Sequence, residues 1–311
     1  MRAVVFHEGR AMIGEAPDPE PGHRQLLVAV RAAGLNGADV AQAKGGYPPP
    51  SGAPDTGGLE MAGEVVAAGP GCQRFSVGDR VMAVVQGGGQ AELCAVDEPL
   101  AMPVPDSLGW PGAGGFPEVF ATAHDALFAQ AGLAMGERVC IHGAAGGVGV
   151  AAVQLAAAVG AEVTATVRNP GSRGAVAELG AHAVDPADFV DAGPFDVILE
   201  LVGAPNWPAN LKASATEGRI TVIGVGAGAE VSLNLALLMV KRLRLLASTL
   251  RPRSLEQRAA VARRLERHVL PLAEAGRVRV PIARTFPLTE ATAAYEYFAA
   301  PGKLGKVVLI P

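Results

Sequence analysis

A glycine-rich turn at residues 142–149, HGAAGGVG, is the segment of this sequence best suited to bind a phosphorylated ligand. It follows the strand-like run ERVCIHG and opens an apolar, helix-like run, and its glycines are spaced GxxGxxG rather than GxGxxG. Gly143 permits a tight turn, Gly146 lets the backbone approach a pyrophosphate, and Gly149 lets a helix pack closely on the strand. The first amides of that helix attract phosphate. The alternative is a packing turn without a ligand. We expect a dinucleotide to contact Gly143, Gly146, Gly147, Val148 and Gly149.

The residues after the next predicted strand indicate which dinucleotide binds. The run AEVTATV ends at Val167 and is followed by Arg168 and Asn169, so the acidic side chain that usually bonds the ribose 2′-hydroxyl of NAD is absent. A guanidinium at this point suits a 2′-phosphate through charge-assisted hydrogen bonds. Arg168 therefore predicts NADPH as the cofactor, with Arg173 as a second candidate. The alternative is that Arg168 is an ordinary surface arginine.

The elements that must position these residues change in type along the chain. Residues 1–116 hold short apolar runs, such as LLVAVRAAG and AGEVVAAG, separated by Pro, Gly and Asp, which predicts a small barrel-like domain. From residue 117 to residue 251 strand and helix patterns alternate, which predicts a parallel sheet with helices on both faces. Residues 252–311 contain a long helix bent near Pro271, a second helix and a final strand, and we expect this tail to return to the first domain.

Composition restricts the class of protein. The 311 residues carry a net charge of −4 without a basic stripe, which argues against a nucleic-acid surface. The N-terminal run MRAVVFHEGR is unlike a signal peptide, and no apolar stretch reaches the ~20 residues of a membrane helix. The three cysteines, Cys72, Cys94 and Cys140, form no CxxC pair, so a reducing, cytoplasmic location is expected.

Several stretches of the chain, in order, resemble those of the medium-chain dehydrogenase/reductase superfamily, in its zinc-independent quinone oxidoreductase branch. They are GLNGADVAQAKGGYPPPSGAPDTGGLEMAGEVVAAG, FPEVFATAHDALF, HGAAGGVGVAAVQLA, STLRPRSLEQRA and GKLGKVVLIP. The resemblance implies an α/β protein with a GroES-like β-barrel catalytic domain, residues 1–116 and 252–311, and a Rossmann doubly wound parallel-sheet domain, residues 117–251. It also implies a homodimer formed by an outer strand of the Rossmann sheet, for which LRLLAST (243–249) is the candidate.

The positions that match zinc ligands in metal-dependent relatives hold residues unsuited to zinc. Asn36 stands where a Cys ligand would be, in GLNGAD, and Leu59 stands where a His ligand would be, in GLEMAG. A catalytic zinc needs three protein ligands and an open position. We therefore expect no metal in this site, and we expect Glu60 to be a structural ion-pair partner.

The resemblance also provides candidates for contact with substrate and cofactor. The catalytic candidates are Asn36, through its amide, and Tyr47, through its phenol; the alternatives are a turn-capping asparagine and a loop tyrosine packed on the proline run. The further cofactor-binding candidates are Thr122, Leu201, Val202, Gly224 and Lys306. For Lys306 the alternative is an edge-strand lysine.

The predicted function is a zinc-independent, NADPH-dependent reductase that transfers hydride to a quinone or a similar activated carbonyl or enone. A quinone is already a strong hydride acceptor, so the protein need supply only orientation and polar contacts. The second candidate is an NADPH-dependent 2-enoyl thioester reductase, in which Tyr47 would donate a proton. A third, of another class, is a non-catalytic NADPH-binding protein. The expected partner is a small-molecule substrate, not nucleic acid or a membrane.

Overall fold

The computed structural model describes all 311 residues, which divide into two compact units. Unit 1 comprises Met1–Ala121 and Leu250–Pro311, and unit 2 comprises Thr122–Thr249. The domain boundaries expected from the sequence lie a few residues from these. None of the helices combines the length and the apolar character needed to cross a membrane.

Unit 1 is built on a sheet in the order β14-β15-β3-β4-β5-β7, with β6 pairing with β3, and on a separate β1–β2 hairpin. Buried and less buried residues alternate over the first half of β3, because successive side chains point to opposite faces of a strand. Its core cluster includes Leu26, Val28 and Met61. The strands are β1 Arg2–His7, β2 Arg10–Glu15, β3 Gln25–Gly34, β4 Glu60–Ala68, β5 Arg80–Val84, β6 Leu93–Asp97, β7 Met102–Pro103, β14 Ile282–Pro287 and β15 Lys306–Ile310.

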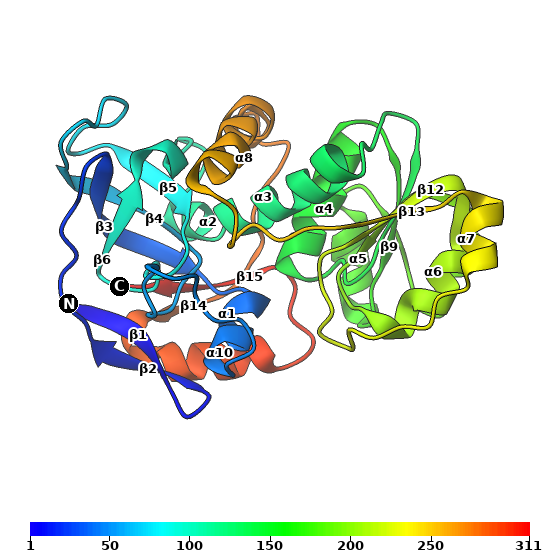
Figure 1. The fold of residues 1–311 in the computed structure, drawn as a ribbon, viewed down its shortest axis with the longest axis horizontal. Helices are drawn as coiled ribbons and strands as arrows, with labels where there is room; N and C mark the ends of the chain where they lie inside the picture. Colours follow the sequence, from blue (N-terminus) through cyan, green and yellow to red (C-terminus); the bar gives the residue numbers. More distant parts are fainter. The chain divides into compact units, whose positions relative to one another are not determined.

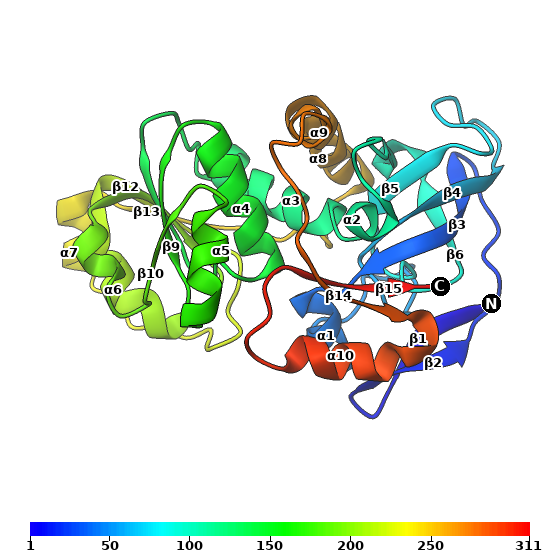
Figure 2. The ribbon, with the colours of Figure 1, turned by 180° about the vertical axis from the view of Figure 1, so that it is seen from behind.

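The C-terminal part of the chain, Leu250–Pro311, belongs to unit 1. Strand β15 pairs antiparallel with β3, and α10 lies along the β1–β2 hairpin (Figures 1 and 2). The sequence predicts one long helix that follows residue 252, and the structure has two, α8 and α9. They are separate because the backbone departs from regular helix at Val269 and because Pro271 has no amide hydrogen to donate to the preceding turn. The helices that begin in unit 1 are α1 Gly37–Ala43, α2 Trp110–Gly114, α3 Pro117–His124, α8 Leu255–His268, α9 Leu270–Glu274 and α10 Ala291–Ala299.

Unit 2 is a six-stranded sheet in the order β10-β9-β8-β11-β12-β13, in which every neighbouring pair is parallel. Helices α4 and α5 lie on one side of the sheet and α6 and α7 on the other (Figures 1 and 2), which is the expected doubly wound arrangement. The elements are a π-helix Asp125–Gln130, β8 Arg138–Ile141, α4 Gly147–Ala158, β9 Glu162–Thr166, α5 Arg173–Ala177, β10 His182–Val184, β11 Phe195–Glu200, α6 Trp207–Ala213, β12 Ser214–Val222, α7 Leu235–Lys241 and β13 Arg244–Ala247. Strand β10 was not expected from the sequence, and β13 lies at the edge, as expected.

Candidate active site

The glycine-rich turn of unit 2 joins β8 to α4 at the carboxyl end of the sheet. Gly143 has a positive φ of 60°, which favours glycine, and its carbonyl accepts the amide of Gly146 at 3.0 Å. A Cβ on Gly149 would lie 2.5 Å from the carbonyl oxygen of Gly143, so any larger residue would push the helix away from the turn. Gly147 and Val148 open α4, where the first amides have no intrahelical acceptor. The turn therefore has the backbone donors and close packing that a pyrophosphate site needs.

Two neighbouring strand ends place Leu201, Val202 and Gly224 together. The main-chain amide of Gly224 donates to the carbonyl of Glu200 at 3.1 Å, and a Cβ on Gly224 would lie 2.4 Å from the carbonyl oxygen of Leu201. Because Gly143 is also in contact range of Leu201 and Val202, these candidates share one edge of the sheet. Thr122 lies in α3 at 9% exposure, and no hydrogen bond or ion pair described for it joins it to this edge.

The two arginines after β9 have different surroundings. The guanidinium of Arg173 is already bonded within the protein: its Nε donates to the carbonyl of Val167 at 3.1 Å, and its Nη2 pairs with Asp185. Arg168 is exposed, and none of its described contacts is a hydrogen bond or an ion pair. Of the two candidates for a 2′-phosphate, Arg168 is therefore the one whose guanidinium is available.

A buried polar cluster in unit 1 contains Asn36, Glu60 and Lys306. The Lys306 ammonium donates to Glu60 Oε1 at 2.6 Å, to Asn36 Oδ1 at 2.7 Å and to the carbonyl of Leu35 at 2.7 Å. Asn36 Nδ2 donates to Glu60 Oε1 at 2.9 Å. Lys306 is 2% exposed and Glu60 is fully buried, so the predicted ion-pair role of Glu60 is confirmed. Because all three ammonium hydrogens are used within unit 1, Lys306 acts on any ligand only through Asn36 and Glu60.

This cluster does not fit a zinc ion. Leu59 is an apolar side chain with 2% exposure. The amide of Asn36 is engaged at both ends, and Glu60 already pairs with an ammonium group. Zinc binds Cys, His and carboxylate ligands, three of them in a catalytic site. The residues at these positions form a closed hydrogen-bonded cluster instead.

Two carboxyl groups beside the cluster have raised pKa values. Burial raises the pKa of Asp39 to about 7, although its Oδ2 accepts a hydrogen bond of 2.8 Å from the main-chain amide of Asn36. Burial, together with the negative charges of Glu60 and Asp39, raises the pKa of Glu118 to about 8. The Glu118 amide donates to Glu60 Oε2 at 2.9 Å, so the start of α3 is tied to the cluster. Near neutral pH both groups can hold a proton, which makes this a site able to give or take one.

Tyr47 lies in the proline-rich loop, held by Arg251. Nη1 of Arg251 donates to the main-chain carbonyl of Tyr47 at 2.9 Å, and its guanidinium carbon lies 5.2 Å from the centre of the tyrosine ring. Burial and the charge of Glu118 raise the pKa of the Tyr47 phenol, while Arg251 opposes this. The phenol is therefore protonated at neutral pH and can donate. No described hydrogen bond joins Tyr47 to Asn36.

Sequence reasoning missed several of the groups just described. Glu118 and Arg251 lie in two of the stretches that resemble the family, but the sequence assigned neither of them a role; an acidic residue in the first turn of a helix, as in PEVF, is only a helix-start signal. In unit 2 no role was predicted for the buried polar residues His142, Thr166 and Glu200. Each stands at or just after the carboxyl end of an apolar strand, and that recurrence was a usable signal.

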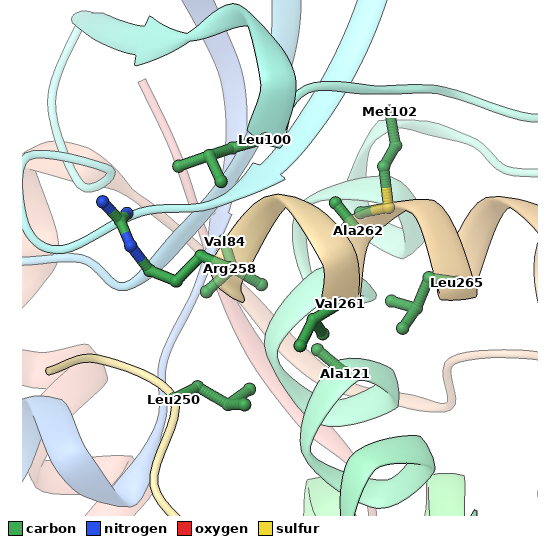
Figure 3. A pocket seen from close by; sticks show the side chains of 9 residues that line it. All are labelled: Val84, Leu100, Met102, Ala121, Leu250, Arg258, Val261, Ala262 and Leu265. Atoms are coloured by element: carbon green, nitrogen blue, oxygen red, sulfur yellow. The ribbon is translucent and has the colours of Figure 1, made fainter. Parts of the chain in front are cut away.

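An apolar slot in unit 1 is lined mainly by α8 and neighbouring strands (Figure 3). Arg258 is its one charged lining residue. The others are Val84, Leu100, Met102, Ala121, Leu250, Val261, Ala262 and Leu265. The slot brings together no acid, base or nucleophile. We therefore interpret it as a packing defect beneath α8 and not as the active site.

Comparison with known families and relatives gives consistent matches. Residues 22–131 match the alcohol dehydrogenase GroES-like domain family, and residues 147–266 match the zinc-binding dehydrogenase family. A quinone oxidoreductase of Rattus norvegicus is 31% identical over 100% of this chain and 98% of its own length. Another, of Pseudomonas aeruginosa, is 32% identical over 94% of this chain and 93% of its own length.

Other similarities point to larger enzymes and to solved structures. The polyketide synthase GfsB of Streptomyces halstedii is 41% identical over 64% of this chain, a region that is only 4% of the synthase. A mycobacterial protein solved in complex with NADPH superposes with a TM-score of 0.88 at 26% identity, over 100% of both chains. An alcohol dehydrogenase superfamily protein from Novosphingobium aromaticivorans gives a TM-score of 0.89 at 29% identity, over 100% of this chain and 99% of its own.

Proposed function

Because the chain belongs to the medium-chain dehydrogenase/reductase superfamily, we propose that it is a zinc-independent reductase that transfers hydride from NADPH to a quinone or a similarly activated enone. It is an oxidoreductase that binds a nicotinamide dinucleotide. The finer assignments, to NADPH, to a quinone and to chemistry without zinc, are the proposal. The rat and Pseudomonas relatives named quinone oxidoreductases support the substrate class.

The observation that carries the proposal is the closed cluster at the zinc-ligand positions. Lys306, Asn36 and Glu60 bond to one another, and Leu59 is buried and apolar. Without a Lewis acid, an unactivated aldehyde or ketone would be a poor acceptor. A quinone or enone needs no such polarisation, because its conjugation already accepts hydride. The cofactor supplies that hydride, and the protein's residues orient the substrate and exchange a proton with it.

The cofactor candidates of unit 2 fit a phosphorylated dinucleotide. The turn from Gly143 to Gly149 would hold the pyrophosphate, and Leu201, Val202 and Gly224 would line the adjoining sheet edge. The exposed, uncommitted guanidinium of Arg168 would hold the 2′-phosphate. The mycobacterial relative solved with NADPH supports the same choice.

A 2-enoyl thioester reductase is the second candidate. It is favoured by the phenol of Tyr47, which can donate a proton, and by the similarity to a polyketide synthase. The two candidates differ in their need for a positioned acid, since the thioester product requires protonation at carbon whereas a hydroquinone takes its proton on oxygen from water.

The deciding experiment follows NADPH oxidation with four acceptors: 1,4-benzoquinone, a naphthoquinone, a 2-enoyl thioester and an aldehyde. We expect turnover with the quinones and none with the aldehyde. Faster turnover of the thioester would favour the second candidate. Tight NADPH binding without oxidation by any acceptor would support the non-catalytic alternative. Metal analysis of the purified protein accompanies the assay, because chelator-sensitive activity that zinc restores would contradict the zinc-independent assignment.

We also propose that the protein is a homodimer joined through unit 2. Strand β13 has one pairing partner, β12, and leaves its other edge open. Next to it, Leu235, Met239 and Val240 on α7 are 64%, 76% and 76% exposed. An open strand edge beside exposed apolar side chains is a common place for self-association. Light scattering should give a dimer mass, and Met239→Lys should shift it toward the monomer; a monomer mass for the unaltered protein would reject the proposal.

A cytoplasmic location remains part of the proposal. Cys72, Cys94 and Cys140 are all free thiols, and Cys94 and Cys140 are buried in separate strands. Free thiols persist in a reducing compartment.

A further inference from the structure

Four buried polar side chains connect the carboxyl ends of three adjacent strands in unit 2. Thr166 ends β9, His142 follows β8, and Glu200 ends β11, while Asn210 projects from α6. Their exposures are 3%, 0%, 1% and 0% in that order. The joining distances are 3.1 Å from Thr166 Oγ1 to His142 Nδ1, 2.7 Å from His142 Nε2 to Asn210 Oδ1 and 2.7 Å from Asn210 Nδ2 to Glu200 Oε2.

The direction of each hydrogen bond follows from the carboxylate. Glu200 Oε1 accepts the amides of Val202 at 2.7 Å and Gly203 at 2.8 Å, so Glu200 acts as an acceptor. Asn210 must then present its NH₂ group to Glu200 and its oxygen to His142. His142 Nε2 therefore carries a hydrogen. Burial lowers the pKa of His142, which favours the neutral ring, so Nδ1 is bare and accepts from the Thr166 hydroxyl.

We propose that Glu200, Asn210, His142 and Thr166 form a positioning relay that fixes the dinucleotide site by holding three strand ends in register and His142 as its Nε2–H tautomer. The inference rests on the proposed binding of NADPH and deepens it. None of the four is assigned contact with the cofactor; they act through the segments that they hold.

The glycine-rich turn and the segment that holds Arg168 both lie next to members of the relay. His142 immediately precedes Gly143, and the main-chain carbonyl of Thr166 accepts the amide of Ala144 at 3.2 Å. Arg168 follows Thr166 by two residues.

Glu200 holds a second part of the same edge. Its carboxylate binds the amides of Val202 and Gly203, and its main-chain carbonyl accepts those of Ile223 at 2.9 Å and Gly224 at 3.1 Å. A disturbance of the relay would therefore displace the pyrophosphate turn, the 2′-phosphate arginine and the Leu201–Gly224 edge together.

Glu200→Gln is the informative variant, because it should reverse the relay. The new amide oxygen can still accept from Val202 and Gly203, so its NH₂ group must face Asn210. The NH₂ group of the new glutamine and the NH₂ group of Asn210 would then face each other, and both are donors. The Asn210 amide must therefore rotate, so that its oxygen faces the glutamine and its NH₂ group faces His142 Nε2. His142 would then carry its hydrogen on Nδ1 and donate it to Thr166.

The test reads the His142 ring nitrogens by ¹⁵N NMR in the protein without cofactor, with the His142→Gln variant for assignment. The expected result is an Nε2–H tautomer in the unaltered protein and an Nδ1–H tautomer in Glu200→Gln. An imidazolium or Nδ1–H ring in the unaltered protein at pH 7, or an unchanged tautomer in the variant, would overturn the proposal. If Glu200→Gln does not fold, Thr166→Val serves instead: loss of the donor to Nδ1 should shift that nitrogen's resonance, and an unmoved resonance counts against the relay.

Cofactor titration gives the second readout. Glu200→Gln should raise the Kd for NADPH by about tenfold or more, the scale of a lost hydrogen bond to a charged group. Asn206→Ala is the matched control, because Asn206 contacts both oxygens of Glu200 at 3.2 Å but lies outside the chain to His142. It should keep the tautomer and change the Kd for NADPH less than Glu200→Gln does, because its two hydrogen bonds are the longest that the Glu200 carboxylate accepts. An unaltered protein that fails to bind NADPH would refute the proposed function, whereas the NMR result judges the relay independently.

Discussion

The two buried polar networks of this protein differ in how completely their hydrogen-bonding groups are satisfied. In unit 2 every side chain of the relay from Glu200 to Thr166 has partners, and none of its polar atoms is left without one. In unit 1 one carboxylate oxygen of Asp39 is buried without a partner, and the pKa values of Asp39 and Glu118 are raised to about 7 and about 8.

This difference separates a network that holds position from one that can change its protonation. A fully satisfied buried network is rigid, because every rearrangement would leave a group unpaired. A cluster that crowds carboxyl groups is poised to exchange a proton near neutral pH. We therefore expect unit 2 to serve as a fixed binding platform and unit 1 as the reactive site.

The largest expected effect comes from breaking the ion pair of unit 1. Lys306→Met leaves the Glu60 carboxylate buried without its cation, which should lower the free energy of unfolding by about 3–5 kcal/mol in chemical denaturation. Arg31→Met is the control, since the Arg31–Glu64 pair has side-chain exposures of 51% and 38% and should contribute at most about 1 kcal/mol.

A double variant keeps this prediction testable if Lys306→Met does not fold. Lys306→Met with Glu60→Gln removes both charges and should recover much of the lost stability, because the unpaired buried charge is the main cost. If the single variant is as stable as the parent protein, or the double variant is no better than the single, the pair is not what holds the cluster together.

The next effect contrasts the two arginines at the edge of unit 2. Arg168→Ala should weaken NADPH binding by about 1.5–3 kcal/mol, roughly 10- to 150-fold, with little change for NADH. Arg173→Ala is the matched control, because Arg173 is already committed to Val167 and Asp185. It should leave the preference for NADPH nearly unchanged. Dissociation constants for both cofactors at fixed ionic strength decide, and equal affinity of the unaltered protein for NADH and NADPH would contradict the assignment.

Much of the fold was predictable from the sequence, because the signals were local. Alternating strand and helix patterns predicted the parallel sheet, the run HGAAGGVG predicted the turn between β8 and α4, and the edge position of β13 was expected. The break at Val269 was predicted only as a bend near Pro271. The short strand β10 was missed because His182–Val184 is too brief to show a period.

The candidate site was less predictable, because its chemistry depends on residues far apart in sequence. Lys306 and Asn36 are 270 positions apart in the sequence. No local pattern could therefore show that the Lys306 ammonium donates all its hydrogen bonds within the cluster. The raised pKa of Glu118 comes first from burial and then from Glu60 and Asp39, which only the folded chain brings near. Arg168 differs from Arg173 through the contacts that Arg173 makes with the carbonyl of Val167 and with Asp185, which only the folded chain shows.

The third prediction concerns the pH dependence of stability, which should have opposite signs for the two networks. An acid whose pKa is raised on folding stabilises the protein fully below its unfolded pKa and loses that contribution as pH rises through the folded value. For Asp39 this window runs from 3.8 to about 7, and for Glu118 from 4.5 to about 8. For His142, whose pKa is lowered, stability is instead lost as pH falls below the unfolded value of 6.5.

The expected result is a stability that declines as pH rises from about 4 to 8, with a slope of at most about 1.4 kcal/mol per pH unit from Asp39. Denaturation curves at several pH values measure it. Asp39→Asn should flatten the slope, and Glu118→Gln should flatten the part nearest pH 8. A slope that survives in both variants would mean that these carboxyl groups are ionised throughout and that unit 1 is as static as unit 2.

The smallest effect expected with the proposed quinone substrate tests whether the reactive character of unit 1 depends on Tyr47. Tyr47→Phe keeps the ring that packs under Arg251 and removes only the hydroxyl. With a quinone most of the turnover should remain, because water can protonate the hydroquinone. With a 2-enoyl thioester the loss should be on the order of 10²–10⁴-fold, the usual contribution of a positioned acid. Tyr297→Phe, on α10 and packed against Phe286, is the control and should change neither rate. A large loss with the quinone would place Tyr47 in the chemistry of both substrates, and the proton for the hydroquinone would then come from the protein rather than from water.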